Sequence, residues 1–135
     1  WGPFLPRQRA FLFPDPLKGS ACKRHNLFLR WRVRGGDGVD FGIWAALSPR
    51  DLIVPIDTHM ARMGRCLGFT RRRTADWKTA EEITAAFREV CPEDPARFDF
   101  ALTRIGILKE CTGKRRGACD WCALARVCSR SRGRF

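Results

Sequence analysis

Apolar residues recur three and four positions apart in three segments of the chain, the spacing that places side chains on one face of a helix. Each segment follows a residue suited to a helix start: Asp57, then Thr74 or Asp76, then Pro95. The stripes are Met60, Met63, Gly64 and Leu67; then Trp77, Ala80, Ile83, Phe87 and Val90; then Phe98, Ala101, Leu102, Ile105 and Leu108. We expect three amphipathic helices that turn these stripes towards one core.

A fourth helix is predicted from Lys23 to Arg34, where apolar residues fall on several sides. We expect it to be largely buried, with Lys23 and Arg24 at its exposed N-terminal end. Gly35-Gly36-Asp37-Gly38 ends it. We expect residues 39–47 to form a helical turn that packs on the core through Phe41 and Trp44, and Ser48-Pro49 to start another short turn.

No segment alternates apolar and polar residues as a strand would, so the predicted fold class is all-α. A chain of 135 residues with 44% hydrophobic content can bury one modest core. We expect a proline-rich extended lead-in at 1–17, truncated because the chain opens at Trp1 without a methionine. A helical domain at 18–110, a four-cysteine loop at 111–128 and a basic tail at 129–135 would follow.

The formal net charge of +12, from 26 Lys and Arg against 14 acids, indicates a polyanionic partner. Nucleic acid is favoured over an acidic membrane surface, although backbone charge does not distinguish DNA from RNA. No apolar run reaches the length of a membrane span, and the N-terminal stretch lacks the order of a signal peptide. We therefore expect a cytoplasmic protein.

Four of the seven cysteines crowd into one segment, a pattern typical of metal ligands in a reducing compartment. They are separated by seven, two and five residues: Cys111, Cys119, Cys122 and Cys128. A single CxxC with widely spaced outer cysteines favours a [4Fe-4S] cluster, with zinc as the alternative. A metal-closed loop would also hold Lys114, Arg115 and Arg116 ready to contact phosphates. We expect Cys22, Cys66 and Cys91 to lie in the core.

Taken alone, Asp57 would do no more than cap its helix, and Lys23 would be a surface lysine that contacts phosphate. Together with the cysteines they resemble a known group. Residues 54–62, Val-Pro-Ile-Asp-Thr-His-Met-Ala-Arg, resemble the V-D-T-H-x-x-R segment of the helix-hairpin-helix DNA glycosylases of the endonuclease III type, whose aspartate is catalytic. The cysteines resemble that group's C-x6-C-x2-C-x5-C iron-sulfur motif, with one extra residue in the first gap.

Residues 19–26, Gly-Ser-Ala-Cys-Lys-Arg-His-Asn, can be laid on the hairpin and the start of its second helix, which puts Lys23 at the catalytic lysine of the bifunctional members. The blocks Gly-Ser-Ala-Cys-Lys-Arg, Leu-Phe-Leu-Arg-Trp and Gly-Val-Asp-Phe-Gly-Ile-Trp also resemble a family of uncharacterised bacterial proteins related to those glycosylases. The hairpin lacks the usual L-P-G-V-G sequence. The stretch from Lys23 to Asp57 is longer than in endonuclease III and nearer the spacing in archaeal 8-oxoguanine glycosylases.

The resemblance implies a base-excision repair glycosylase with abasic-site lyase activity. Its substrate would be double-stranded DNA that carries an abasic site or a damaged base, oxidised bases included. Lys23 would form a Schiff base with the sugar, and Asp57 would activate the amine or steady positive charge on the sugar. A flipped base would stack on Trp31, Phe41 or Trp44. The DNA backbone would contact Lys18, Gly19, Ser20, Arg24, Arg62, Lys114, Arg115 and Arg116.

The resemblance also implies a monomer associated with the nucleoid. Glycosylases of this type use two helical lobes, so a preceding N-terminal half would be needed to complete the cleft. The alternative is a non-catalytic nucleic-acid-binding module held together by its metal, or an incomplete fragment of a glycosylase.

Overall fold

The computed structural model describes residues 11–108, 111–114 and 117–129. Within these ranges the chain is helical and has no strand, so the all-α prediction is confirmed for them. The α-helices are α2 (Lys23–Val33), α3 (Thr58–Leu67), α4 (Trp77–Val90) and α5 (Asp99–Leu108). Short 3-10 helices form at Pro16–Lys18, Pro49–Asp51 and Gly117–Cys119.

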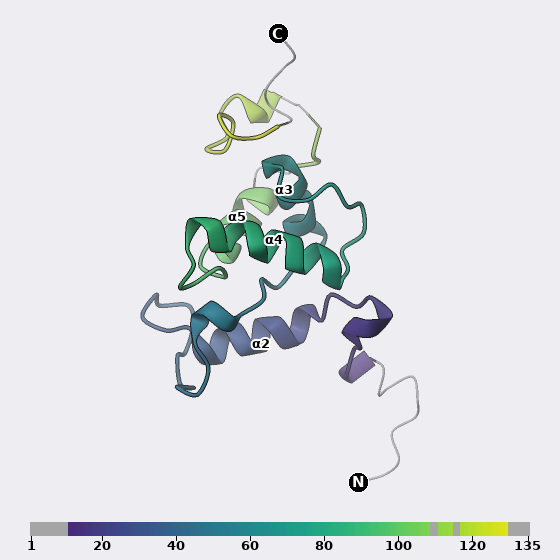
Figure 1. Ribbon diagram of the computed structural model, residues 1–135. Coiled ribbons are helices and arrows are strands. Elements are labelled where there is room, and N and C mark those ends of the chain that lie inside the picture. Colours follow the sequence, from purple (N-terminus) through teal and green to yellow (C-terminus); the bar gives the residue numbers. More distant parts are fainter. Residues whose placement is uncertain (1–10, 109–110, 115–116, 130–135) are drawn as a thin grey trace.

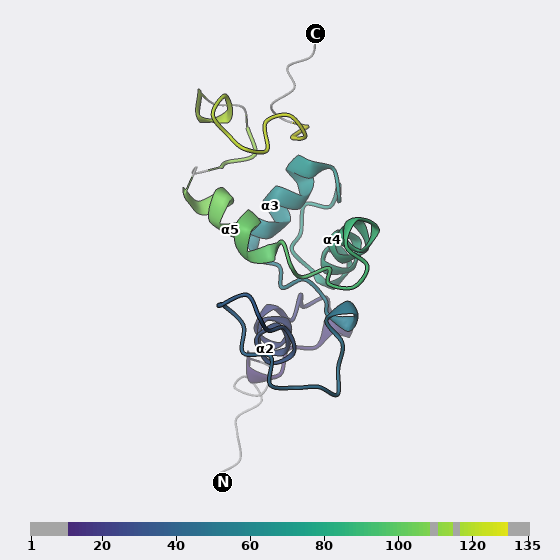
Figure 2. The same ribbon diagram turned by 90° about the vertical axis from the view of Figure 1, so that its left-hand side faces the viewer.

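The helices form a stack in which α3, α4 and α5 lie between α2 at one end and the cysteine-containing segment, 111–129, at the other (Figures 1 and 2). Helix α3 is central because it packs against both α4 and α5. The chain crosses from α2 to this three-helix group through residues 34–57. Two surfaces therefore arise on opposite sides of the group, one facing α2 and one facing the cysteines.

Helix α3 forms as its stripe predicts. Asp57 is its N-cap, and Met60, Met63 and Gly64 are buried. The bare Cα of Gly64 lets α4 approach closely, because a Cβ at this position would lie only 2.5 Å from Cδ1 of Ile83. The main apolar core is built around this contact and comprises Val54, Ile56, Met60, Ala80, Ile83, Phe87 and Leu102.

Helix α4 also follows its stripe, except at its last residue. Asp76 rather than Thr74 is the N-cap and accepts a hydrogen bond from the Thr79 amide at 2.9 Å. Ala80, Ile83 and Phe87 are buried. Val90 is 67% exposed, so its assignment to the core is wrong: the helix ends there, beyond the reach of the neighbouring helices.

Helix α5 differs more from its prediction. It begins at Asp99, four residues after Pro95, and buries Asp99, Leu102 and Gly106. Ala101 and Leu108 are exposed. The buried face is therefore rotated relative to the predicted stripe, because α5 turns a carboxylate towards α2 and a glycine towards α3.

Helix α2 starts at Lys23 as predicted, but its burial is different. Phe28 and Trp31 are about 40% exposed, at 42% and 39%, whereas Arg30 is only 2% exposed and Arg34, just beyond the helix, is 6% exposed. These two cations are buried because carboxylates surround them. Arg30 pairs with Asp40 and Asp99, each at 3.2 Å; Arg34 pairs with Asp37, Asp40 and Asp94. The expectation of a largely apolar, buried helix is therefore wrong.

Residues 39–47 form an irregular segment that is exposed except at Asp40, rather than a helical turn packed on the core. Their amides bond instead to the end of α2: Phe41 donates to the Trp31 carbonyl at 2.8 Å and Trp44 to the Arg32 carbonyl at 2.8 Å. Gly42 permits this return, because its φ is +61° and a Cβ there would lie 2.7 Å from Cα of Gly35.

The expected lead-in at 1–17 lies partly outside the described residues. Residues 11–12 are helical and Pro16–Lys18 forms a 3-10 helix, so this part is not extended. In the part of the chain that the structure describes, no helix combines the length and apolar character needed to cross a membrane.

Candidate active site and cysteine cluster

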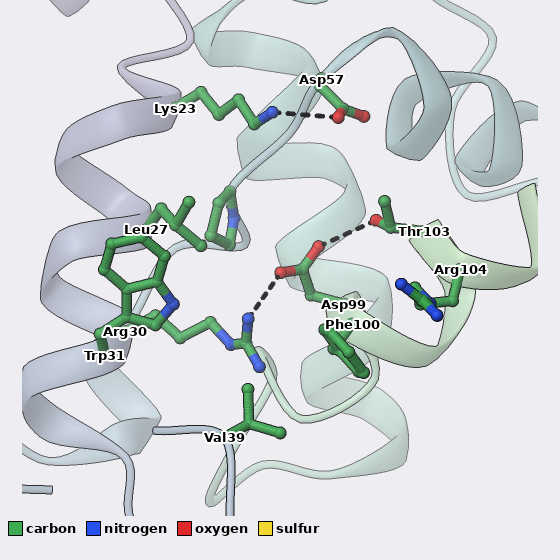
Figure 3. A pocket seen from close by; sticks show the side chains of 11 residues that line it. Lys23, Leu27, Arg30, Trp31, Val39, Asp57, Asp99, Phe100, Thr103 and Arg104 are labelled. Atoms are coloured by element: carbon green, nitrogen blue, oxygen red, sulfur yellow. Dashed lines mark hydrogen bonds and ion pairs between the residues drawn. The ribbon is translucent and has the colours of Figure 1, made fainter. Parts of the chain in front are cut away.

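Lys23 and Asp57 meet although they are 34 positions apart in the sequence. The Lys23 Nζ lies 3.0 Å from Oδ2 of Asp57 (Figure 3). Lys23 is the first residue of α2, which follows a tight turn with left-handed backbone at Gly19 and Cys22. Asp57 lies in extended backbone immediately before α3. The contact therefore joins the starts of the two helices.

A pocket of about 360 Å³ opens beside this pair, between α2 and α5 (Figure 3). Pockets of a few hundred Å³ suit small ligands such as a single nucleobase. Its walls are mostly apolar, with a few charged groups. The lining residues are Lys23, Leu27, Arg30, Trp31, Val39, Pro55, Asp57, Asp99, Phe100, Thr103 and Arg104.

The two oxygens of Asp57 have separate tasks. Oδ1 accepts the Met60 amide at 2.8 Å and caps α3, while Oδ2 accepts from Lys23. Burial by itself would raise the Asp57 pKa, but the Met60 amide and the Lys23 amine outweigh it and hold the pKa below its usual value. The carboxylate is thus ionised at neutral pH and available to Lys23 while it caps the helix.

A second carboxylate, Asp99, lies within the same pocket. Its Oδ2 accepts from Nη1 of Arg30 at 3.2 Å, and its Oδ1 accepts from the Thr103 hydroxyl at 3.4 Å. Burial raises the pKa of Asp99 to about 6, although the charge of Arg30 partly opposes this. The pocket therefore contains two acids with different protonation behaviour, and each accepts a hydrogen bond from a cation of α2 (Figure 3).

Only one of the three aromatic residues expected to stack on a base lines the pocket. Trp31 does so from α2. Phe41 is 71% exposed on the irregular segment, and Trp44 packs edge-on against Phe28 with ring centroids 5.6 Å apart. The backbone bonds from this segment to the end of α2 hold both residues away from the pocket lining.

The residues expected to contact the DNA backbone fall into two groups. Lys18, Gly19 and Arg24 are exposed and Ser20 is half-buried, all in the turn and first helical turn beside Lys23. The Arg24 guanidinium lies 3.9 Å from the centroid of the Phe11 ring.

The second group lies near the cysteine segment. Arg62 on α3 bonds to Nδ1 of His59 at 2.7 Å and lies beside Gly113. Lys114 is exposed. Arg115 and Arg116 lie outside the described residues. The structure therefore brings Arg62 and Lys114 to the end of the stack opposite α2.

The four cysteines proposed as ligands line a single small cavity against α3 and α5. The cavity measures about 30 Å³ and has an apolar surround that includes Met63, Leu67, Ile105 and Leu124. Four thiols around an apolar cavity form a donor set and environment suited to an iron-sulfur cluster or zinc. No three His, Cys, Asp or Glu side chains among the described residues are already drawn together in a metal-binding group.

A fifth cysteine, Cys66 of α3, lines the same cavity. It is buried, as predicted for a core residue, and its thiol interacts through hydrogen bonds with Cys111 and Cys128. Burial, followed by these neighbours, raises the Cys66 pKa to about 12. The Cys66 carbonyl oxygen accepts a hydrogen bond from the Ser129 amide at 2.7 Å. The end of the cysteine segment therefore packs against this turn of α3.

Comparison with family models gives one match, described as "Protein of unknown function (DUF2400)", over residues 4–108. The chain belongs to this family. No curated protein and no solved structure matches it. The match includes every residue of the α2–α5 pocket and ends before Cys111. In this DUF2400 protein the pocket is thus part of the family region, whereas the cysteine segment lies outside it.

Sequence reasoning missed two charged residues of the DUF2400 pocket, Arg30 and Asp99. The two residues are 69 positions apart in the sequence, and no local sequence pattern predicts their contact. One signal was available. Arg30 and Arg34 are four positions apart, a spacing that places two cations on the same face of the predicted helix, where they need acidic partners if that face is buried.

Proposed function

We propose that this protein is a DNA base-excision repair glycosylase with abasic-site lyase activity. The observation that carries the proposal is the Lys23–Asp57 contact of 3.0 Å at the edge of a pocket sized for a base. An amine that donates to a carboxylate is arranged for nucleophilic chemistry, because the carboxylate can accept its proton. The turn at 19–22 followed by α2 would be the second half of a helix-hairpin-helix.

In this mechanism Asp57 accepts a proton from the Lys23 ammonium, and the freed amine attacks C1′ of the deoxyribose. The bond from C1′ to the base breaks, and the base leaves with the electron pair and takes up a proton. Opening of the sugar ring gives an imine between Lys23 and C1′. Loss of a proton from C2′ then expels the 3′ phosphate by β-elimination, which nicks the strand.

The expected substrate is duplex DNA with an abasic site or a damaged base, oxidised bases included. A base inside a duplex has to be extruded to reach such a pocket, and Trp31 lies where it can stack on one. The net charge of +12 favours a polyanion, with Lys18 and Arg24 beside the pocket as backbone contacts. We place the protein in the cytoplasm, at the nucleoid.

We further propose that Cys111, Cys119, Cys122 and Cys128 hold a [4Fe-4S] cluster, with zinc as the alternative. The cluster would be structural and would fix the basic loop that contains Lys114. Assays of iron, acid-labile sulfide and zinc in anaerobically purified protein separate the two. Equal iron and sulfide that disappear in Cys122→Ser support the cluster; zinc without sulfide supports the alternative.

Borohydride trapping on duplexes with an abasic site or 8-oxoguanine tests the catalytic proposal. Reduction of the imine would leave a covalent protein–DNA adduct. We expect an adduct with the wild type and none with Lys23→Gln. Asp57→Asn should slow trapping strongly while keeping α3 intact, because asparagine is as good an N-cap as aspartate. Lys78→Gln is the matched control, since Lys78 is an exposed lysine of α4 that does not line the pocket.

Equal trapping by the wild type and Lys23→Gln would show that another amine reacts and would refute the assigned nucleophile. Duplex binding without any adduct, by protein loaded with its metal, would favour the non-catalytic binding module. That alternative uses the same charge but not the Lys23–Asp57 pair.

A further inference from the structure

We propose that Arg30 and Asp99 read the polar edge of the base in the α2–α5 pocket, and that the pocket prefers oxo-bearing bases to amino-bearing ones. This inference rests on the proposed function, because it assumes that the ligand is an extruded base. An oxo-bearing, or lactam, base presents a carbonyl beside a ring N–H, as uracil and hypoxanthine do. An amino-bearing base, such as cytosine or adenine, presents an amino group beside a bare ring nitrogen.

Arg30 has a buried hydrogen-bond donor, its Nε, that a ligand could use. Its side chain extends from α2 across the pocket to Asp99 (Figure 3). Two of its nitrogens are used, Nη1 by Asp99 and Nη2 by Asp40. Its Nε is buried and has no hydrogen-bond partner among the described residues. A buried donor without a partner is unfavourable, so a ligand that brings an acceptor to this position is favoured.

Asp99 supplies the complementary acceptor. A carboxylate has about four acceptor positions, and the described contacts of Asp99 use two of them, for Arg30 and Thr103. The remaining positions can accept the ring N–H of a lactam. A donor from Arg30 next to an acceptor from Asp99 therefore matches an edge with a carbonyl beside an N–H.

The charge balance of the pocket decides between the two kinds of edge. Its lining includes three cations, Lys23, Arg30 and Arg104, and two carboxylates, Asp57 and Asp99. Arg104 forms no ion pair with any described residue and lies 5.8 Å from the centroid of the Phe100 ring. Lys23 is already paired with Asp57, and Arg30 with Asp40 and Asp99, so the cation left for a ligand to pair with, among the described lining residues, is Arg104. This donor favours carbonyl oxygens and opposes both amino groups and cationic, alkylated rings.

The test compares single-stranded deoxyadenosine oligonucleotides that differ at one central base: uracil, cytosine, hypoxanthine or adenine. Single strands remove the cost of extrusion, and uracil–cytosine and hypoxanthine–adenine are matched by ring size. Fluorescence anisotropy measures the Kd of the full chain for each. We expect uracil and hypoxanthine to bind about tenfold more tightly than their partners, within the discrimination known for a paired contact to a base edge.

Asp99→Asn should abolish most of this preference, because one acceptor oxygen becomes an NH2 donor of the same shape. Lys78→Gln should keep it. Circular dichroism checks that Asp99→Asn is folded. Should that variant fail to fold, Arg104→Gln changes an exposed residue of the same pocket and should reduce the preference several-fold.

Equal Kd values within both matched pairs for the wild type would overturn the inference, as would a wild-type preference retained by folded Asp99→Asn or by Arg104→Gln. Trapping on an abasic duplex involves no base in the pocket. Failure of that trapping with a retained oxo preference would refute the catalytic proposal alone, whereas trapping without base preference would refute only the inference made here.

Discussion

Asp99→Asn should remove a specific component of the pH dependence of stability. In the folded protein burial raises the Asp99 pKa to about 6, from an ordinary value of 3.8. Lys23 and Arg30 of α2, Asp57 before α3, and Thr103 and Arg104 of α5 surround it. The cations among these oppose the shift, and the charge of Asp57 adds to it. Asparagine has the same shape and does not titrate.

The sign follows from proton binding. Between the unfolded and folded pKa values of Asp99 the folded state holds the proton more tightly than the unfolded state. The resulting stabilisation is fully present below pH 3.8 and is lost as the pH rises through about 6. The difference between pKa values of 3.8 and about 6 corresponds to about 3 kcal/mol of stability.

Urea unfolding followed by tryptophan fluorescence, at pH values from 4 to 7.5, measures this difference. The free energy of unfolding of the wild type minus that of Asp99→Asn should fall by about 2.5 kcal/mol between pH 4 and pH 7.5, since a small part of the effect is already lost at pH 4. Asp37 and Asp57, whose pKa values are lowered on folding, have the opposite pH dependence, but both proteins contain them. Parallel pH profiles for the two proteins would refute the assignment of a raised pKa to Asp99.

Two further predictions concern the three-helix group and use the same unfolding assay at pH 7. Gly64→Ala should destabilise the protein by about 1–3 kcal/mol, because the new methyl would lie 2.5 Å from Ile83 Cδ1. An unchanged urea midpoint of unfolding would show that α3 and α4 can move apart without cost. Thr84→Val should lower the free energy of unfolding by about 1–3 kcal/mol, because the Thr84 hydroxyl accepts a hydrogen bond from the buried Val54 amide at 3.0 Å. Thr84→Ser keeps the hydroxyl and should lose much less stability.

Helix positions were predictable from sequence wherever a local signal existed. Asp57, Asp76 and Ser48 cap the elements that follow them, as their residue types indicate. The start of α2 at Lys23 follows from the small-residue turn before it. These features depend on residues within one helical turn, so a single sequence is enough to locate them.

The burial of α2 was not predictable in the same way. Apolar content indicated that Phe28 and Trp31 would be covered, whereas the structure buries Arg30 and Arg34 instead. Which face is buried depends on carboxylates from two places: residues 37–40, in the segment that returns to the end of α2, and residues 94–99, which are 60 or more positions further along the chain. A periodicity shows that a helix has an apolar face but does not show what its polar residues will meet.

The residues of the candidate site also fall into those that a sequence motif identifies and those that only the tertiary structure reveals. Lys23 and Asp57 were found because motif residues identified each of them, and the structure brings the two side chains into contact. Asp99 belongs to no motif, and its role depends on α5 being rotated so that a carboxylate rather than an apolar residue faces α2. Phe41 was expected at the pocket because it is aromatic and near α2 in sequence, but backbone bonds direct its segment elsewhere.

The way in which α2 is attached to the rest of the protein leaves space for the pocket. Helix α2 is joined to the rest of the protein by a small apolar cluster at one end, where Val33 and Leu29 meet Leu52 and Ala96, and by ion pairs along its length. Tight apolar packing along the whole of α2 would close the space between α2 and α5. The Arg30–Asp99 ion pair of 3.2 Å joins α2 to α5, and the Lys23–Asp57 pair of 3.0 Å joins α2 to the start of α3, and both leave room beside them. Because Arg30 is only 2% exposed, its charge needs carboxylate partners, and Asp99 is one of them. The residues that hold the helices together are therefore the same ones that give the pocket its polar groups. Truncating Arg30 would leave Asp99 without its cationic partner, so loss of folding could not be told from loss of recognition. Asp99→Asn keeps an acceptor for Arg30, and its effect on stability is measured separately by the urea unfolding described above.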